Sequence, residues 1–158
     1  MNKLAIYPGC FDPITLGHVD IIERASLLFD SLHIVIAENL QKSSMFTVKD
    51  RLNMAINSVK HIDNVVVNVH NGLITDYAKE IGARAMVRGI RTVSDVDYEF
   101  QLAFFNRKLA PQITTIFLAP ANEYTYISSS SVRELIKLKQ NIDEFVPVYA
   151  AEFIRKII

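Results

Sequence analysis

Short apolar runs alternate with helical segments along nearly the whole chain of 158 residues. The runs have the length and the apolar character of buried parallel strands, and the segments between them repeat apolar residues at helical spacing. Five strands separated mostly by helices indicate an α/β fold with one doubly wound parallel sheet, right-handed crossovers and helices on both faces. The predicted strands are Leu4–Tyr7, Leu32–Ala37, Val65–Val69, Ala85–Val87 and Ile113–Leu118.

The segments between these strands carry helix start and stop signals. Thr47 and Asp50 have the spacing of a capping box, and the apolar stripe of the helix that follows is Leu52, Ala55, Ile56 and Val59. Later in the chain Ser94 or Asp95 is the expected cap of a long helix that Pro111 ends. The remaining predicted helices are 17–29, 73–81, 130–139 and 147–158.

Composition limits the classes of function. Lys plus Arg equals Asp plus Glu, 17 of each, so nothing indicates general electrostatic binding to nucleic acid or to an anionic membrane. No apolar run reaches the roughly 18 residues of a membrane span, and the first apolar run is too short for a signal peptide. Cys10 is the single cysteine, which excludes an intramolecular disulfide and a multi-cysteine metal site. We expect one cytoplasmic domain over residues 1–158.

The loop after the first strand is the strongest functional signal. Pro8, Gly9 and Pro13 interrupt regular structure, and His18 lies at the N-terminus of the following helix. A helix N-terminus presents unpaired N–H groups and a partial positive charge, which suits phosphate. The loop contains neither GxxxxGK[ST] nor GxGxxG, so a P-loop enzyme and a dinucleotide-binding enzyme are both disfavoured.

Basic and hydroxyl residues follow the other strands as well. Lys42 comes after the second strand, Arg88 and Arg91 after the fourth, and the serines 128–131 after the fifth. Because the carboxyl ends of parallel strands lie along one edge, these residues are expected beside His18. Such a cluster in a chain of zero net charge favours a site for two or more phosphate-bearing substrates.

The same residues carry a resemblance that covers almost the whole chain. The segment Gly9-x-Phe11-Asp12-Pro13 with Thr15-Leu-Gly-His18 resembles the first signature of the nucleotidyltransferase superfamily, and Ile127-Ser-Ser-Ser resembles the second. Thr15 stands where the superfamily usually has the first histidine of its His-x-Gly-His box. This replacement, with Arg88-Gly-Ile-Arg91, Tyr98-Glu99 and Tyr124, is similar to the phosphopantetheine adenylyltransferase family.

The resemblance implies a Rossmann-like fold and an enzyme of coenzyme A biosynthesis. Such an enzyme transfers an adenylyl group from ATP to 4′-phosphopantetheine and releases dephospho-coenzyme A and pyrophosphate. It also implies Mg²⁺ bound with ATP, and a homohexamer. The sequence has no carboxylate cluster for the metal, so no metal-binding residue is predicted and substrate oxygens and water are expected to supply most ligands.

The resemblance also implies a role for individual residues. His18 is the expected catalytic residue, as donor to the α-phosphate. The ATP-binding residues are Cys10, Phe11, His18, Gly89, Ile90, Arg91, Glu99, Tyr124, Thr125, Tyr126, Ile127, Ser128, Ser129 and Ser130. The residues that bind the acceptor are Cys10, Lys42, Ile74 and Arg88. Cys10 departs from the family, which usually has Thr or Ser there.

Three alternatives remain open from the sequence. One is another nucleotidyltransferase, specific for a pyridine mononucleotide or dependent on CTP, against which Thr15 counts. A second is a non-catalytic nucleotide-binding or stress-response domain on the same fold, against which His18 and the anion-binding residues around it count. The third is a thiol enzyme using Cys10 and His18, for which no orienting third residue is identifiable.

Overall fold

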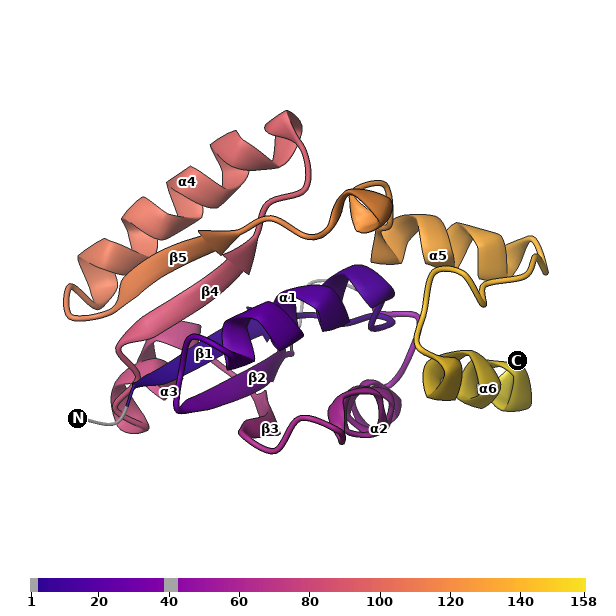
Figure 1. Ribbon diagram of the computed structural model, residues 1–158, viewed down its shortest axis with the longest axis horizontal. Helices are drawn as coiled ribbons and strands as arrows, with labels where there is room; N and C mark the ends of the chain where they lie inside the picture. The colour runs from indigo at the N-terminus through magenta and orange to yellow at the C-terminus, as the bar shows by residue number, and fades with distance from the viewer. Residues whose placement is uncertain (1–2, 39–42) are drawn as a thin grey trace.

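The computed structural model describes residues 3–38 and 43–158, and it shows one parallel sheet of five strands between layers of helices (Figure 1). The strands are β1 (Leu4–Gly9), β2 (Ser31–Ala37), β3 (Val65–His70), β4 (Ala85–Gly89) and β5 (Thr114–Leu118). The helices are α1 (Leu16–Ser26), α2 (Val48–Val59), α3 (Ile74–Glu80), α4 (Val93–Leu109), α5 (Ser129–Lys137) and α6 (Val148–Ile157), with a short 3₁₀ helix at Asn122–Tyr124. The predicted α/β fold is confirmed.

The strand order β3-β2-β1-β4-β5 places a topological switch point between β1 and β4. From β1 the chain winds outward through β2 to β3, then returns to the other side of β1 for β4. The register pairs Gly9 with Ile36 and Gly89 with Leu118, so the carboxyl ends of the strands lie along one edge. A crevice forms outside the strand ends at such a switch point, and ligands bind there in open α/β sheets.

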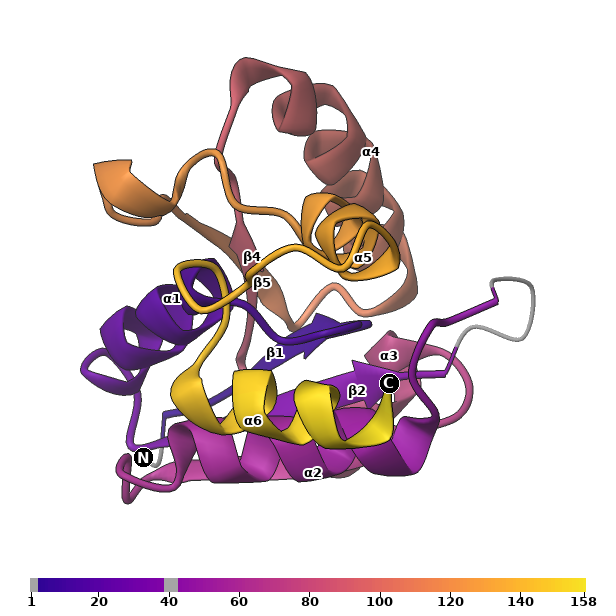
Figure 2. The ribbon, with the colours of Figure 1, turned by 90° about the vertical axis from the view of Figure 1, so that its right-hand side faces the viewer.

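The two faces of the sheet have separate cores. On one face α1 and α2 pack against the strands, and apolar residues of α5 and α6 join the same core. Figure 2 shows α6 alongside α2 at the base of this layer. On the other face a smaller core forms between the sheet and α3, including Ile6, Val35 and Ala78. Two layers of helices on one sheet are what the alternating pattern predicted.

The helix termini confirm some sequence predictions and correct others. Thr47 and Asp50 form the predicted capping box of α2. The predicted cap of α4, Ser94 or Asp95, is wrong: Thr92 has the extended backbone of the cap, and the Asp95 carboxylate accepts its N–H at 3.2 Å. Thr, Ser and Asp near this terminus are all good caps, so only the backbone conformation decides between them.

The predicted apolar stripe of α2 is partly wrong. Ile56 is 45% exposed, whereas Arg51 is only 3% exposed. The stripe that α2 buries is therefore rotated toward Arg51, Met54, Ala55, Ser58 and Val59. A buried arginine on this helix is the feature that the apolar pattern could not indicate.

α4 is the longest helix of the described residues, and Glu99 is its one buried side chain. The aromatic side chains of Phe100, Phe104 and Phe105 are 42%, 62% and 58% exposed. Figure 1 shows this helix beside β5 at the margin of the molecule. Among the described residues, none of the helices combines the length and the apolar composition needed to cross a bilayer.

Candidate active site

The loop that joins β1 to α1 folds back under the first turn of α1. Phe11 adopts a left-handed backbone conformation with φ of 48°, which turns its buried ring toward Gly9. A Cβ atom on Gly9 would lie 3.0 Å from that ring, so a side chain at this position would force the ring to move. Phe11 also meets the His18 imidazole edge to face, with centroids 5.0 Å apart. The predicted loop is therefore a tightly packed support for His18.

His18 and Thr15 form a reciprocal cap at the N-terminus of α1. The Thr15 hydroxyl accepts the His18 backbone N–H at 3.3 Å, and Nδ1 of His18 accepts the Thr15 backbone N–H at 3.1 Å. A backbone N–H can only donate, so Nδ1 of the neutral imidazole must be the acceptor and the proton must lie on Nε2. Thr15 thus fixes the tautomer as well as the ring orientation of His18.

The surroundings of His18 keep the imidazole neutral. Burial favours the uncharged form most strongly, and the charges of Arg91 and Arg88 act in the same direction. Together they lower the pKa of His18 from 6.5 to about 4. At neutral pH the residue is therefore an uncharged donor at Nε2, poorly suited to act as a general base but suited to hydrogen-bond a phosphate oxygen.

Arg88 and Glu99 form an almost buried, two-pronged ion pair across the switch point. Nε and one Nη of Arg88 each donate to a different carboxylate oxygen of Glu99 at 2.7 Å, and the other Nη donates to the Pro8 carbonyl at 3.0 Å. The resemblance implied that Glu99 binds ATP. In the structure both of its oxygens are used by Arg88, which fixes a positive charge at the end of β4.

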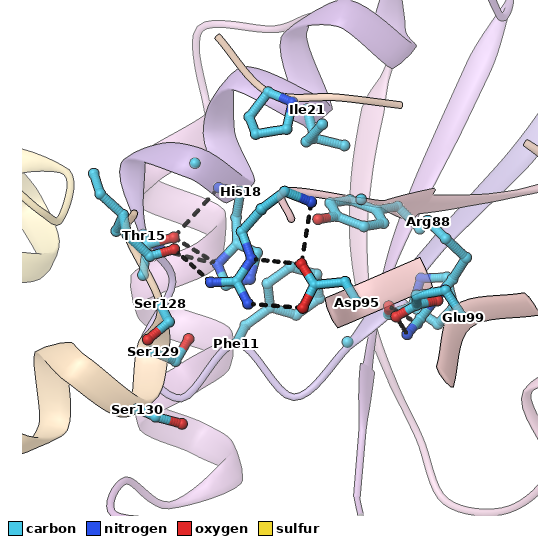
Figure 3. Close-up of a pocket in the computed structure, with 18 residues that line it drawn as sticks. Phe11, Thr15, His18, Ile21, Arg88, Asp95, Glu99, Ser128, Ser129 and Ser130 are labelled. Atoms are coloured by element: carbon cyan, nitrogen blue, oxygen red, sulfur yellow. Dashed lines mark hydrogen bonds and ion pairs between the residues drawn. The ribbon is translucent and has the colours of Figure 1, made fainter. Parts of the chain in front are cut away.

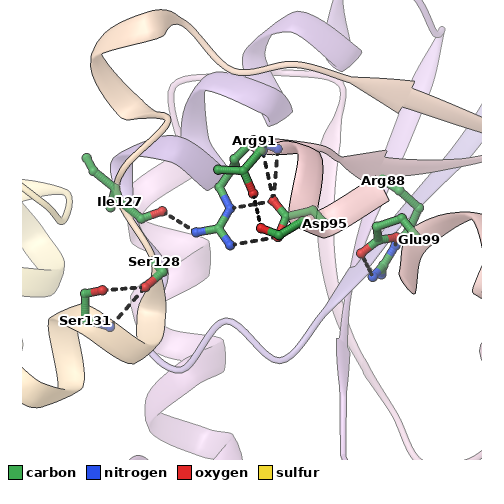
Figure 4. A network of polar contacts seen from close by, with 9 residues as sticks. Arg88, Arg91, Asp95, Glu99, Ile127, Ser128 and Ser131 are labelled. Atoms are coloured by element: carbon green, nitrogen blue, oxygen red, sulfur yellow. Dashed lines mark hydrogen bonds and ion pairs between the residues drawn. The ribbon is translucent and has the colours of Figure 1, made fainter. Parts of the chain in front are cut away.

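Arg91 joins the start of α4 to the second signature of the sequence. Figure 4 shows its guanidinium between Asp95 and Ile127. It donates to the Ile127 carbonyl at 2.7 Å, and the Asp95 carboxylate accepts its backbone N–H at 3.1 Å and pairs with its side chain at 3.4 Å. Partial burial of Asp95 favours the neutral acid, but the bond from the Arg91 N–H and the charge of Arg91 outweigh it and hold the carboxyl pKa below its ordinary value.

The serines of the second signature form the N-terminus of α5. Ser128 caps the helix, accepting the Ser131 N–H at 3.0 Å. The Ser129 hydroxyl donates to the Pro13 carbonyl at 2.9 Å and so joins α5 to the loop after β1. Free N–H groups and hydroxyls at a helix start are a favourable environment for phosphate oxygens.

Asp12 links the loop after β1 to two other segments. It belongs to the first signature, but no role was predicted for it from the sequence. Its two carboxylate oxygens accept the backbone N–H groups of Met45 and Phe46, each at 2.9 Å. Arg133 of α5 donates to the Asp12 carbonyl at 2.6 Å. The loop after β1, the segment leading into α2 and the start of α5 are therefore held to one another through Asp12.

These residues enclose a cleft of about 270 Å³ at the switch point (Figure 3). Ten predicted site residues line it: Phe11, His18, Arg88, Gly89, Arg91, Glu99, Ile127, Ser128, Ser129 and Ser130. The lining also includes residues not predicted as site residues, namely Tyr7, Pro8, Gly9, Thr15, Gly17, Ile21, Asp95 and Pro120. Asp95 could have been found from its place three residues after Thr92, where a carboxylate can accept the backbone N–H of a helix cap.

The other predicted site residues do not line this cleft. Cys10 is exposed on the loop, and Ile74 is the first residue of α3. Ile90 and the segment 124–126 are sequence neighbours of residues that line the cleft. The Tyr124 Cβ lies 3.6 Å from the position that a Cβ on Gly17 would occupy. Lys42 lies outside the described residues, so its predicted position has no structural counterpart here.

Comparisons with known proteins agree with this geometry. The cytidylyltransferase-like family model matches residues 6–135, a span that contains both signatures. A phosphopantetheine adenylyltransferase of Alkaliphilus metalliredigens (strain QYMF) is 45% identical over 145 residues, which are 92% of each chain. The chain belongs to the phosphopantetheine adenylyltransferase family. The predicted family is confirmed, and so is the nucleotidyltransferase class of chemistry that it implies.

A solved structure supports the fold of this family member independently. It is a Vibrio parahaemolyticus protein whose assignment as a nicotinate-nucleotide adenylyltransferase is provisional. The TM-score is 0.75, and the match covers 98% of this chain and 99% of the other at 20% identity. At that identity the likeness concerns the fold, and it confirms the predicted Rossmann-like architecture.

Proposed function

We propose that this protein transfers the adenylyl group of ATP to 4′-phosphopantetheine, giving dephospho-coenzyme A and pyrophosphate. The observation that carries the proposal is the meeting of both signatures of the adenylyltransferase family at one cleft. His18 comes from the first signature and Ser128 from the second, and Arg91 donates to Ile127 of the second signature. The relative that is 45% identical bears the name of this activity.

The proposed chemistry needs positioning and charge stabilisation rather than a base. An oxygen of the pantetheine phosphate, already anionic near neutral pH, attacks the α-phosphorus of ATP. The bond from that phosphorus to the bridging oxygen of the β-phosphate breaks, and pyrophosphate leaves. The neutral Nε2–H of His18 donates to the α-phosphate oxygen on which charge accumulates. This role agrees with the pKa of His18 of about 4.

In this proposal each half of the cleft binds one of the two substrates. Arg91 and the serines at the start of α5 hold the β- and γ-phosphates of ATP, and the segment 124–127 borders the nucleoside. Arg88 and Lys42 hold the phosphate of the acceptor, and Ile74 borders its pantetheine arm. Glu99 positions Arg88 through their ion pair.

Mg²⁺ enters the proposal with ATP. Among the described residues there is no group of three or more metal-binding side chains. The two carboxylates that line the cleft, Asp95 and Glu99, already pair with arginines. Triphosphate oxygens and water are therefore the proposed ligands, and the ion would neutralise charge on the leaving pyrophosphate.

We also propose that the protein assembles with itself, as a hexamer by analogy with its family, in the cytoplasm, where ATP is available. The exposed aromatic side chains of α4 support an assembly, since large apolar groups gathered on one surface mark contact sites. Size-exclusion chromatography with light scattering measures the oligomer directly.

The test of the activity is incubation with ATP, Mg²⁺ and 4′-phosphopantetheine, with pyrophosphate release as the readout. Nicotinate mononucleotide in place of the acceptor, and CTP in place of ATP, are the matched controls for the neighbouring activities of the superfamily. We expect pyrophosphate release with ATP and 4′-phosphopantetheine, and none with either control substrate. Equal or faster release with either control substrate, or none with any, contradicts the proposal.

A further inference from the structure

Arg51 is a buried arginine beneath the loop after β1. It belongs to α2, is 3% exposed, and reaches the end of the sheet next to the cleft. One Nη donates to the carbonyl of Cys10 at 2.8 Å and to that of Ala37 at 3.5 Å. Cys10 and Ala37 directly follow Gly9 and Ile36, the last residues that pair β1 with β2. Arg51 thus joins the two strands where their ladder of hydrogen bonds ends.

The charge of Arg51 is not compensated within the described residues. No carboxylate there forms an ion pair with it, although the structure pairs Arg88 with Glu99 and Arg91 with Asp95. Its Nε is buried and lacks a hydrogen-bond partner among those residues. Burying a charged group costs free energy unless an opposite charge or a full set of hydrogen bonds compensates it. Two carbonyl bonds from one Nη compensate only part of that cost.

An anionic ligand would supply the missing compensation. Arg51 bonds to Cys10, in the loop that also carries His18, on the β2 side of the switch point. The arginines on the β4 side are already neutralised by Glu99 and Asp95. Cys10, whose carbonyl accepts from Arg51, is among the residues predicted to bind the acceptor, so the uncompensated positive charge lies beside the acceptor half of the proposed site.

We propose that Arg51 is a positioning residue that also supplies fixed positive charge for the phosphate of the acceptor substrate. It holds the backbone of Cys10 against Ala37, and its charge strengthens binding of the acceptor phosphate without direct contact being required. This role rests on the proposed function and extends it to a residue outside the two signatures. It also accounts for a buried arginine where the apolar pattern of α2 predicts none.

The test compares three variants for binding of each substrate alone by calorimetry. Arg51→Met removes the charge and keeps the length of the side chain, and Arg51→Lys keeps the charge. Lys49→Met is the control, because it removes an exposed positive charge from the same helix. We expect Arg51→Met to weaken binding of 4′-phosphopantetheine about tenfold or more. Arg51→Lys and Lys49→Met should stay within about threefold, and the Kd for ATP should change little in all three.

Thermal unfolding without substrate separates this role from a purely structural one. When an apolar side chain of similar size replaces Arg51, relief of the uncompensated buried charge offsets the loss of its two carbonyl bonds. We therefore expect the Tm of Arg51→Met without anions to equal or exceed that of the wild type. Failure of this variant to fold, a Tm several degrees lower, or unchanged acceptor binding would each overturn the proposal.

The result is distinguishable from failure of the proposed function. If the wild type binds 4′-phosphopantetheine and releases pyrophosphate, the function stands whatever Arg51→Met does. If the wild type does neither, the function fails, and the role of Arg51 in acceptor binding fails with it.

Discussion

The backbone N–H of Thr15 donates to Nδ1 of His18, and this one bond determines where the imidazole proton lies. The bond forms because Thr15 is the cap of α1 and His18 is the third residue of the helix, the two positions that reach each other in a capping box. A cap that ordinarily stabilises a helix here also directs the Nε2–H of His18 toward the cleft. Local helix geometry and the proposed catalytic role thus depend on the same pair of residues.

Replacing His18 by Ala should lower kcat by roughly 10²–10³ and change the KM for ATP much less. The lost donor acts mainly on charge that develops in the transition state, while the arginines and serines of the cleft still bind the ground state. Steady-state pyrophosphate release at varied ATP measures both constants. His61→Ala is the control, because that histidine is exposed, lies outside the cleft and pairs with an exposed Glu23. A near-normal kcat in His18→Ala would make the residue a helix cap and nothing more.

The depressed pKa of His18 predicts a dependence of stability on pH. The residue titrates near 6.5 when unfolded and at about 4 when folded, so between these values the unfolded chain binds more protons. The free energy of unfolding should therefore fall as the pH is lowered from about 6.5 toward about 4, by up to about 1.4 kcal/mol per pH unit. Urea unfolding at several pH values measures the slope.

His18→Gln is the comparison for this slope, since it cannot take up the proton. The pKa of His33 is also lowered by burial, and its contribution has the same sign. Because His33 is present in both proteins, the difference between their slopes reports on His18 alone. Identical slopes for wild type and variant would contradict the lowered pKa of His18.

Glu99→Gln should destabilise the protein by about 3 kcal/mol, because it leaves the nearly buried Arg88 without its counter-charge. It should also raise the KM for 4′-phosphopantetheine more than that for ATP, since Arg88 belongs to the acceptor half. Asp143→Asn is the control: its pair with Arg155 is half-exposed on both sides, and its loss should cost less than about 1 kcal/mol. If urea unfolding shows that Glu99→Gln and Asp143→Asn lower the free energy of unfolding equally, burial adds nothing to the Arg88–Glu99 pair.

The fold was predictable because its determinants are local. Each strand and helix carries its own apolar spacing, and Gly82, directly after the predicted helix 73–81, has the left-handed φ of 72° beyond the end of α3. The loop from Gly9 to His18 was also predictable as a phosphate site, since its residue types and its place before a helix are visible in the sequence. Both follow from neighbours along the chain.

What the sequence did not predict depends on contacts between distant segments. In the sequence Arg51 resembles a surface charge on α2, and only the tertiary structure shows that it lies against the ends of β1 and β2. Asp12 reaches Met45 and Phe46 only because the loop after β1 folds beside the segment leading into α2. Neither contact leaves a periodic trace, so only the tertiary structure reveals them.

Cys10 gives the last prediction, which concerns chemistry at the loop itself. The thiol is exposed, so a reagent can reach it, and it lies between Gly9 and Phe11, which both line the cleft. Cys10→Ser and Cys10→Thr should keep turnover near that of the wild type, because the His18 side chain bonds to Thr15 and needs no thiol. Alkylation with a bulky maleimide should abolish turnover by blocking the loop, and prior binding of ATP or 4′-phosphopantetheine should slow it. Cys10→Ser treated with the same reagent is the control and should stay active. An inactive but folded Cys10→Ser would restore a thiol mechanism, whereas full alkylation without loss of turnover would place Cys10 outside the site.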